Sequence, residues 1–309
     1  MILLTGATGF LGQFVLQELL DQGFEITALT RAHNNITKRY PDVNWIKADL
    51  SKPGLLKKIP PPSDGIVHLA STLSIRPNTM LNVDVKGMLA LLEIWNKGPF
   101  IFISSTDVYG PLRKIPADEE HPLMPSNWYG FGKSICEQTL QFSGRMKGND
   151  NFVIFRAPYI LGPHQKFQTS LIGTIITLAM TGRDFILPKE CNTGERLFGH
   201  SWVNALDISC WIASALRNGP SGAYNAASGF FTWEELLELI IDLTHSTSSI
   251  IYSKNDDMTL GLCAEERRFS TDKLKQAYNI QGSRFLREIL IEIISEINSQ
   301  TTGGLQNFF

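Results

Sequence analysis

The chain has 309 residues, of which 43% are hydrophobic and 19% charged, and its formal net charge is -2. That length can bury a sizeable core, and it predicts one large α/β domain or a core domain with a smaller one attached. Because the basic residues are scattered rather than gathered, the composition argues against nucleic acid or an acidic membrane surface as a partner.

Short apolar runs alternate with helical patterns along the first half of the chain. Strands are predicted over Ile2–Leu4, Ile26–Leu29, Trp45–Ala48, Ile66–Leu69, Phe100–Ile103 and Phe152–Phe155. Helices are predicted over Phe10–Leu20, Met80–Trp95 and Trp128–Met146. This alternation predicts an α/β fold, a doubly wound parallel sheet of six or more strands with helices on both faces.

After residue 162 the order changes to helices, loops and short strands. Helices are predicted over Gln168–Thr181, Ala205–Arg217 and Thr232–His245, and a last one is expected to end near Asn298 with fraying beyond it. Thr232 and Glu235 have the spacing of a capping box. We therefore expect a dinucleotide-binding domain at residues 1–162 that carries the catalytic residues. Residues 163–309 are expected to form a smaller α+β domain that mainly binds substrate, with some segments returning to the first.

The cysteines and the apolar segments indicate the compartment. The four cysteines are isolated, with no CxxC pair and no histidine at metal spacing, which favours reduced thiols and predicts no metal site. The first residues already have the pattern of a buried strand, so no cleavable leader is expected. The longest apolar helical stretch, Leu171–Met180, is too short to span a bilayer. These features predict a cytoplasmic protein without a membrane partner.

A glycine-rich turn follows the first predicted strand. The segment Thr5–Gly12 has GxxGxxG spacing and opens an amphipathic helix. Gly6 permits a tight turn, Gly9 lets backbone approach a pyrophosphate, and Gly12 lets the helix lie close to the sheet. A glycine-rich turn can serve packing alone, but its place after the first strand favours binding of the phosphates of a dinucleotide.

The residues after the second predicted strand indicate which dinucleotide binds. An acid there would hydrogen-bond the ribose 2′-hydroxyl of NAD, whereas an arginine accommodates the 2′-phosphate of NADP. Thr30 and Arg31 stand at this place, and no carboxylate follows until Asp42. The pattern therefore favours NADP over NAD, the alternative being that Arg31 is a solvated loop charge. Asp49, after the third strand, is a candidate for the adenine pocket.

Tyr129 and Lys133 stand four residues apart at the start of a predicted helix, so their side chains share one face. A phenol with a pKa near 10 is a poor base at neutral pH, but a nearby ammonium favours the phenolate and so permits proton exchange. The same spacing is also common in surface helices. Ser105 and Thr106 follow a predicted strand, where a hydroxyl can donate to a substrate carbonyl, and Ser105 is the first choice.

Thr5–Gly12, Ser104–Gly110 and Tyr129–Lys133 together resemble the extended short-chain dehydrogenase/reductase superfamily, in its NAD-dependent epimerase/dehydratase branch. The likeness runs over nearly the whole chain and implies a Rossmann fold. Further segments that occur in the order of that branch are Ala48–Leu50, His68–Ala70, Arg156–Pro163 and Gly222–Ser228.

The resemblance implies a catalytic set of Ser105, Tyr129 and Lys133. Asp84 stands where many members have an asparagine, and Gly132 replaces the usual serine before the lysine. Neither change removes the proton-transfer pair.

The residue pattern and the resemblance together give the expected contacts. Cofactor contacts are expected at Gly6, Thr8, Gly9, Phe10, Leu11, Gly12, Arg31, Asp49, Leu50, Leu69, Ala70, Ser71, Tyr129, Lys133 and Pro158. Substrate contacts are expected at Thr72, Thr106, Asp107, Tyr159 and Arg196. The resemblance also implies that two long helices, near Met80–Trp95 and Trp128–Met146, pair across a homodimer.

Some of these positions bear on the substrate. Tyr159 stands where nucleotide-sugar members often carry an asparagine that holds the sugar diphosphate, which weakens assignment to a UDP-sugar. Arg196 resembles an arginine that contacts a nucleotide phosphate, but its irregular spacing leaves a plain loop arginine as an equal alternative. Thr106 and Asp107 replace the Asp-Glu pair of sugar 4,6-dehydratases, which disfavours dehydration, although Asp107 could still act as an acid.

We expect an NADP-preferring reductase or epimerase acting at a secondary alcohol or ketone of a nucleotide-linked sugar. Ser105 would polarise the carbonyl, while Tyr129 moves the proton and Lys133 tunes it and binds the nicotinamide ribose. A first alternative is a ketoreductase on a non-sugar small molecule, suggested by Tyr159 and the apolar region Phe167–Met180. A second is a non-catalytic dinucleotide-binding sensor or assembly factor, against which the intact catalytic set argues.

Overall fold

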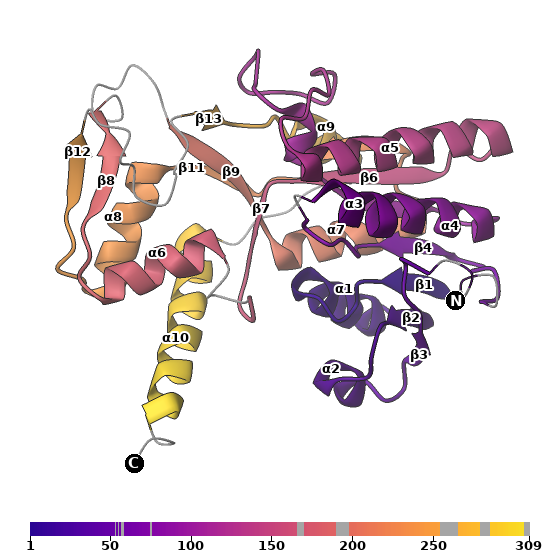
Figure 1. Ribbon diagram of the computed structural model, residues 1–309, viewed down its shortest axis with the longest axis horizontal. Helices are drawn as coiled ribbons and strands as arrows, with labels where there is room; N and C mark the ends of the chain where they lie inside the picture. The colour runs from indigo at the N-terminus through magenta and orange to yellow at the C-terminus, as the bar shows by residue number, and fades with distance from the viewer. Residues whose placement is uncertain are drawn as a thin grey trace. The chain divides into compact units, whose positions relative to one another are not determined.

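The computed structural model describes residues 1–52, 54, 56, 59–74, 76–165, 170–189, 198–253, 265–278 and 285–305. The chain divides into two compact units, whose elements are labelled in Figure 1. Unit 1 comprises Met1–Pro158, Ala205–Ala226 and Ser270–Gln281. Unit 2 comprises Tyr159–Asn204, Ala227–Phe269 and Gly282–Phe309. The chain first leaves unit 1 after Pro158, four residues before the expected boundary, and it returns to unit 1 twice.

A parallel sheet forms the centre of unit 1. Seven of the described strands belong to it, in the order β10-β6-β5-β4-β1-β2-β3. Their bounds are β1 Ile2–Thr5, β2 Ile26–Thr30, β3 Asn44–Lys47, β4 Gly65–His68, β5 Phe100–Ser105, β6 Phe152–Ala157 and β10 Gly222–Asn225. The chain order reverses between β1 and β4, and ligands of such sheets bind at the carboxyl ends of the strands beside this reversal. The doubly wound fold is therefore confirmed.

Helices cover both faces of this sheet, with α4 and α5 on one face and α1 and α7 on the other (Figure 1). The helices of unit 1 are α1 Phe10–Asp21, α2 Asn35–Arg39, α3 Pro77–Met80, α4 Lys86–Ile94, α5 Trp128–Lys147, α7 Ala205–Asn218 and α9 Asp272–Tyr278, with the 3-10 turn η3 at Thr106–Tyr109. Most side chains between the sheet and the helices are apolar, because most strands are buried on both faces, and the buried polar exceptions include the pair of Arg156 and Glu137.

The helix predicted over Met80–Trp95 is confirmed, since helical backbone runs from Pro77 to Ile94, but the helix is not regular throughout. A π-helical turn, η2 at Leu81–Val85, separates α3 from α4. Its buried member is Asp84, whose carboxylate accepts two hydrogen bonds from Thr72. These hydrogen bonds hold the turn against the loop that contains Thr72. The apolar periodicity of the sequence does not predict them.

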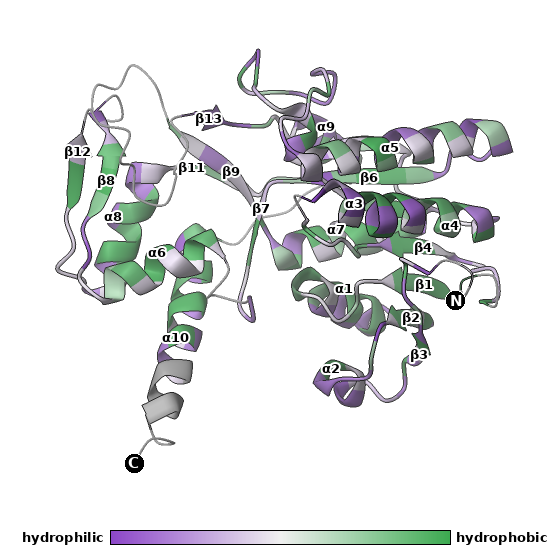
Figure 2. Cartoon of the chain, viewed as in Figure 1, coloured by the Kyte–Doolittle hydropathy of each residue, from purple (hydrophilic) through white to green (hydrophobic). Residues whose placement is uncertain are grey.

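Unit 2 contains a mixed sheet and a two-stranded sheet. The mixed sheet holds β7 Tyr159–Leu161, β9 Gly199–Asn204, β11 Gly229–Thr232 and β13 Glu266–Arg267, and the smaller sheet pairs β8 Phe185–Pro188 with β12 Ile250–Ser253. The helices are α6 Leu171–Met180, α8 Trp233–Thr244 and α10 Leu286–Leu305. Figure 2 shows the hydrophobic residues concentrated along α6 and α8, which contribute to the core of this unit.

The ends of two helices of unit 2 test the sequence predictions. The capping box at Thr232 and Glu235 is confirmed, because each side chain accepts a backbone N–H of the other residue. Helix α10 continues to Leu305, past the end that was expected near Asn298. Within the described ranges, no helix combines the length and the hydropathy that a membrane span requires.

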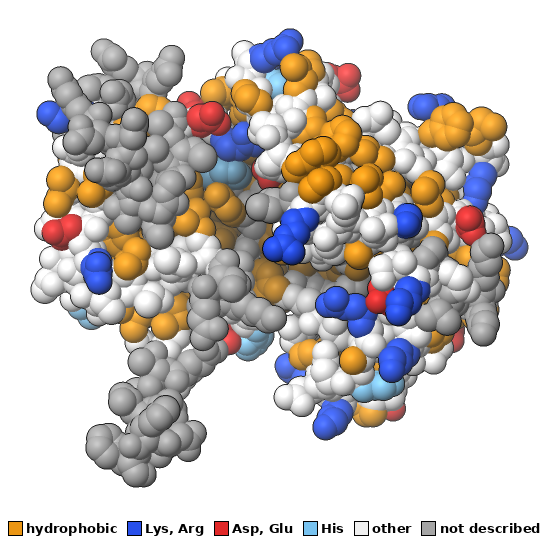
Figure 3. All heavy atoms as spheres, in the orientation of Figure 1, with side chains coloured by type: hydrophobic (Ala, Val, Ile, Leu, Met, Phe, Trp, Pro, Cys, Tyr) orange, Lys and Arg blue, Asp and Glu red, His pale blue; other side chains and the backbone are white. Residues whose placement is uncertain are grey.

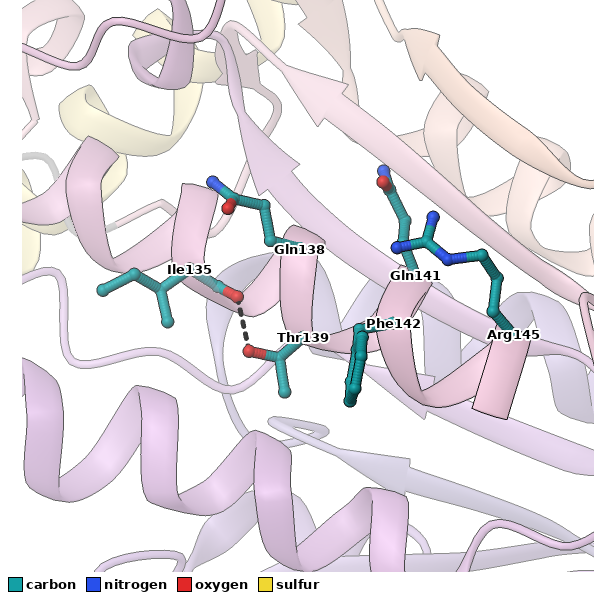
Figure 4. Close-up of a pocket in the computed structure, with 6 residues that line it drawn as sticks. All are labelled: Ile135, Gln138, Thr139, Gln141, Phe142 and Arg145. Carbon is teal, nitrogen blue, oxygen red and sulfur yellow. Dashed lines mark hydrogen bonds between the residues drawn. The ribbon is translucent and has the colours of Figure 1, made fainter. Parts of the chain in front are cut away.

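A row of apolar side chains is exposed along α5 and the neighbouring helix. Figure 3 shows hydrophobic side chains gathered over the first turns of α5. The row, called here the α5 strip, consists of Trp128, Phe131, Phe142 and Met146 on α5 with Leu81 and Leu89 beside them, each between 41% and 71% exposed. The same helix carries a hollow of about 400 Å³. The side chains that line it, drawn in Figure 4, are Ile135, Gln138, Thr139, Gln141, Phe142 and Arg145.

Candidate functional site

The glycine turn between β1 and α1 approaches its neighbours too closely for side chains. Gly6 has a φ of 78°, and a Cβ there would stand 2.7 Å from the backbone nitrogen of Ala70. A Cβ at Gly12 would stand 2.0 Å from the carbonyl oxygen of Gly6. Gly9 is the N-cap of α1, and no side chain caps this helix. Amides of its first turn are therefore available to an anion, as the phosphates of a dinucleotide require.

A cavity of about 450 Å³ opens beside this turn, at the carboxyl ends of the strands. Among the expected site residues, its lining includes Gly6, Thr8, Gly9, Arg31, Asp49, Leu50, Leu69, Ala70, Ser71 and Thr72. The lining also includes Thr5, Leu29, Thr30, Ala48, Ser51 and Val83, which were not among the expected contacts. The size and the uncapped helix suit a dinucleotide. Phe10, Leu11 and Gly12 form the first turn of α1 and do not line the cavity.

Strand ends could have revealed most of the missed lining residues. Thr5 ends β1, Thr30 ends β2, and Ala48 follows β3, all at the edge of the sheet where ligands bind. Val83 belongs to the π-helical turn η2, and no pattern in the sequence signals that position.

Two opposite charges line the cavity near the ends of β2 and β3. Asp49 accepts hydrogen bonds from the backbone nitrogen and the hydroxyl of Ser51 at 2.9 and 2.8 Å. These bonds lower the pKa of the Asp49 carboxyl, and the charges of Lys52 and Arg31 act in the same direction. Arg31 itself is exposed. The structure thus brings together Arg31 and Asp49, which the sequence assigned to the same ligand.

Tyr129 and Lys133 lie on one face of α5, as their spacing predicts. Asn127 starts the helix, because its side chain accepts the backbone N–H of Gly130 at 2.7 Å. The Lys133 ammonium is buried and donates to the carbonyl oxygen of Ile103 at 2.8 Å. It lies 5.7 Å from the centre of the Tyr129 ring. Burial lowers the pKa of Lys133, while the nearby carboxylate of Asp84 raises it.

Ser105 ends β5, and its hydroxyl lies close enough to the Tyr129 phenol to affect its pKa. Burial raises the pKa of the Tyr129 phenol, the carboxylates of Asp107 and Asp84 raise it further, and only the hydroxyl of Ser105 lowers it. The phenol therefore keeps its proton at neutral pH. Lys133 is not among the groups that shift this pKa, so its expected effect on the phenol stays a prediction.

A buried ion pair fixes α5 against β6. Arg156 donates to the Glu137 carboxylate at 2.8 Å, and the two side chains are 5% and 0% exposed. Arg156 also donates to the hydroxyl of Tyr109 at 2.8 Å, which in turn donates to Asn225 on β10. The network joins α5, β6, η3 and β10, so it supports the helix that carries Tyr129 and the turn that follows Ser105.

The remaining expected residues are spread over the chain. Thr106 is 1% exposed, and Asp107 follows it in η3. Pro158 follows β6 at the end of a unit 1 segment, whereas Tyr159 begins unit 2, where its ring lies 4.2 Å from that of His200. Arg196 lies outside the described residues.

Comparison with known proteins identifies the family. The model of the NAD-dependent epimerase/dehydratase family matches residues 2–227. The chain belongs to the NAD-dependent epimerase/dehydratase family. The resemblance inferred from the motifs is thus confirmed, and the protein is an enzyme of this family.

Relatives in this family include both epimerases and dehydratases. The UDP-glucose 4-epimerase of Haemophilus influenzae is 28% identical over 271 residues, which cover 74% of this chain and 78% of that protein. The dTDP-glucose 4,6-dehydratase of Streptomyces antibioticus is 26% identical over 262 residues, covering 78% of this chain and 76% of the relative. The structure of the UDP-glucose 4-epimerase of Thermotoga maritima with UDP-glucose superposes with a TM-score of 0.82 at 20% identity, over 97% and 99% of the two chains.

Proposed function

We propose that this enzyme is an NAD(P)-dependent epimerase or reductase that acts at a secondary alcohol or ketone of a nucleotide-linked sugar. The observation that carries the proposal is the pairing of Tyr129 with the buried Lys133, whose ammonium lies 5.7 Å from the centre of the phenol ring, next to Ser105 and in the same unit as a dinucleotide-sized cavity. The substrates named for its epimerase and dehydratase relatives support a nucleotide sugar.

The protein residues would supply positioning and proton transfer. Ser105 would donate a hydrogen bond to the substrate oxygen as negative charge develops on it. Tyr129 would give a proton to that oxygen in reduction and accept it in oxidation, with Lys133 stabilising the phenolate form. The bound dinucleotide would accept or return a hydride at the substrate carbon. Because the Tyr129 phenol is neutral before the reaction, it already holds the proton that it would donate in reduction.

The residues beside Ser105 support epimerisation or reduction over dehydration. Removal of a hydroxyl and a neighbouring proton requires an acid and a base beyond the Ser-Tyr-Lys set. Thr106 is a buried hydroxyl and supplies neither. Asp107 is the one carboxylate of η3, so a complete pair for elimination is missing from this turn.

A ketoreductase acting on a non-sugar small molecule is the second candidate. It is favoured by the aromatic side chain of Tyr159 and by the apolar helix α6 in unit 2. Under either proposal unit 2 would contribute substrate contacts, among them Tyr159 and Arg196. Melting temperatures with UDP-, GDP- and dTDP-sugars would separate the candidates, because a ligand that binds only the folded state raises stability. A non-catalytic sensor would bind the dinucleotide and turn over none of the substrates tested.

We also propose that the cofactor is NADP rather than NAD. Arg31 lines the cavity where β2 ends, and a guanidinium there can bind a 2′-phosphate. The chain has no carboxylate at that strand end to hold the 2′-hydroxyl of NAD.

The α5 strip supports a homodimer. Its α5 members, Trp128, Phe131, Phe142 and Met146, recur at helical spacings on a helix of 20 residues. A second copy would place the same strip against this one, because a two-fold interface is self-complementary. The strip and its hollow combine aromatic and aliphatic side chains with polar ones and a single charged one, Arg145, and interfaces between subunits are enriched in aromatic residues, Met and Arg.

Replacement of Tyr129 by Phe tests the proposed function. The variant keeps the ring and loses the proton, so kcat should fall by about 100- to 10,000-fold with dinucleotide affinity retained. Tyr40→Phe, at a half-buried position of unit 1 outside the cavity lining, serves as the matched control and should keep full turnover. Intact turnover by Tyr129→Phe would refute the proposed mechanism.

A further inference from the structure

The loop that follows β4 carries a strained residue. Leu73 has a φ of 51°, in the left-handed region that is unfavourable for a residue with a bulky side chain. The Leu73 side chain is 72% exposed, so its packing offsets little of that strain. Other contacts must therefore hold the loop in this conformation.

The holding contact is a pair of hydrogen bonds from the preceding residue, Thr72, to the carboxylate of Asp84. The backbone N–H of Thr72 donates to one oxygen at 3.1 Å, and its hydroxyl donates to the other at 2.7 Å. Asp84 is 7% exposed, and hydrogen bonds to a charged acceptor are the strong ones. Two longer bonds follow the same turn, from Leu73 N–H to the Ser71 hydroxyl at 3.4 Å and from Ser74 N–H to the Thr72 hydroxyl at 3.3 Å. Asp84 is therefore the main restraint on the described part of the loop.

The backbone of Asp84 is itself held against α5. Its carbonyl oxygen accepts the thiol of Cys136 on that helix at 3.7 Å. One turn earlier, a Cβ on Gly132 would stand 2.4 Å from a side-chain carbon of Met80, so the end of α3 also lies directly on α5. The side chain of Asp84 thus joins the loop to a packed pair of helical segments.

Residues of this loop form one wall of the cavity. Ala70–Thr72 line it, as does Val83 of η2. The bonds to Asp84 therefore fix a lining residue directly. The start of the same wall is fixed at the glycine turn, where the backbone N–H of Ala70 donates to the hydroxyl of Thr5 at 3.3 Å.

The order of the strands decides which part of a dinucleotide this wall would face. β4 lies between β1, which leads into the glycine turn, and β5, which ends at Ser105. Arg31 and Asp49 follow β2 and β3, on the opposite side of β1. With the pyrophosphate at the glycine turn and the adenosine near Arg31, the nicotinamide half is left for the side of β4 and Ser105.

We propose that Asp84 is a positioning residue that holds the cavity wall Ala70–Thr72 in the shape that binds the nicotinamide half of the dinucleotide. Without its two bonds Leu73 leaves the left-handed region, and only a fraction of the molecules keeps the binding shape. The affinity for the dinucleotide falls in proportion to that fraction. This inference rests on the proposed function, because that function places a dinucleotide in the cavity.

Asp84→Ala removes both bonds and should raise the dissociation constants of NADP and NAD about 10-fold, measured by calorimetry. ADP carries only the adenosine half and the pyrophosphate, so its dissociation constant should not change. Asp84→Asn should bind both dinucleotides as the wild type does, because the amide oxygen accepts the N–H of Thr72 and the amide nitrogen donates to its hydroxyl. The exposed variant Asp42→Asn controls for the lost charge.

A substitution at Leu73 separates the shape of the loop from the general stability of the protein. Glycine adopts the left-handed region without strain. Leu73→Gly added to Asp84→Ala should therefore restore most of the affinity, and Leu73→Gly alone should bind as the wild type does. If Asp84→Ala does not fold, Thr72→Val takes its place, because it keeps the volume and loses the hydroxyl bond. It should show the same loss and the same rescue by Leu73→Gly, and Thr72→Ser should show neither.

Unchanged dissociation constants of NADP and NAD in Asp84→Ala would overturn the positioning role and leave the proposed function standing. An equal loss of affinity for ADP, or a loss that Leu73→Gly does not restore, would also overturn it. A wild-type protein that binds neither NADP nor NAD would overturn the proposed function itself.

Discussion

The backbone of Asp107 lies directly against the α-carbon of Gly130. A Cβ on Gly130 would stand 2.4 Å from the carbonyl oxygen of Asp107, which is too close for any side chain. The contact seats the first turn of α5 on the turn η3, next to Ser105 and one residue from Tyr129. The distance between the Ser105 hydroxyl and the Tyr129 phenol therefore depends on Gly130, which has no side chain and takes no part in the reaction.

Gly130→Ala should destabilise the protein by about 1–3 kcal/mol, because the clash is with backbone that cannot rotate away. It should also lower kcat by displacing Tyr129. Gly54→Ala is the control, since a Cβ there would have no other atom within 4 Å. That variant should change the free energy of unfolding by less than about 1 kcal/mol. Equal losses in the two variants, measured by urea denaturation, would contradict this account.

The stability of the fold should fall in mild acid because of His68. Its ring is buried, Thr5 bonds it at 2.7 Å, and burial followed by the charge of Lys133 lowers its pKa from 6.5 to about 3. Between pH 6.5 and 3, His68 therefore binds a proton in the unfolded chain but not in the folded one. The contribution of His68 is complete above pH 6.5 and declines as pH falls towards 3, with a loss of about 2 kcal/mol at pH 5.

His68→Gln should remove that part of the pH dependence, although the variant is less stable overall at neutral pH. Urea denaturation at neutral pH and near pH 5 measures the difference. The surface variant His33→Gln should retain the wild-type dependence. An acid sensitivity of His68→Gln as steep as that of the wild type would contradict the assignment.

Arg31→Ala should weaken NADP binding by about 10- to 100-fold, since a charge-assisted hydrogen bond to a phosphate is lost. NAD has no 2′-phosphate, so its dissociation constant should change little. Titration of both dinucleotides by calorimetry gives the ratio. Arg39→Ala, an exposed change on α2, controls for the general loss of positive charge. An equal loss of affinity for NAD and NADP would show that Arg31 does not bind the 2′-phosphate and is a solvated loop charge.

Phe142→Glu should dissociate the proposed homodimer, because two copies of a carboxylate would face each other within an apolar interface. Phe142 is 58% exposed on α5 and belongs to the strip. Phe285→Glu is the control, as Phe285 is 75% exposed in unit 2 and outside the strip. Analytical ultracentrifugation measures the mass, and a wild type that sediments as a monomer would refute the dimer.

Strong local patterns made the central sheet predictable. Six strands were placed within two residues of their observed bounds, because most of them are buried on both faces and are therefore apolar runs; β3, at the edge of the sheet, is the partly exposed exception. The seventh, β10, was missed because Gly222–Asn225 is short and half polar, and it becomes a strand only by pairing with β6. The glycine turn and the start of α5 were likewise predictable, since each depends on its own neighbouring residues.

The electrostatics of the site were not predictable in the same way. Spacing along α5 places Tyr129 and Lys133 on one face, but the pKa of the phenol depends on Asp84 and Asp107, which come from two other elements. The sequence reveals neither the burial of these groups nor the turn that carries Asp84. The roles of the catalytic, cofactor and substrate residues remain predictions, and the experiments above test them.

Unit 1 is built from segments that are far apart in the sequence, so it cannot finish folding until late in synthesis of the chain. Its sheet and its covering helices need α7 and β10, which lie beyond the first 158 residues of the chain. Until Gly222–Asn225 leaves the ribosome, β6 is an open sheet edge and α1 lacks the helix that covers it. Chaperones should therefore bind mainly to nascent chains whose last exposed residue lies between Pro158 and Asn225. A fragment cut after Pro158 should aggregate, and a minimal dinucleotide-binding module would have to be produced by splicing the returning segments onto it.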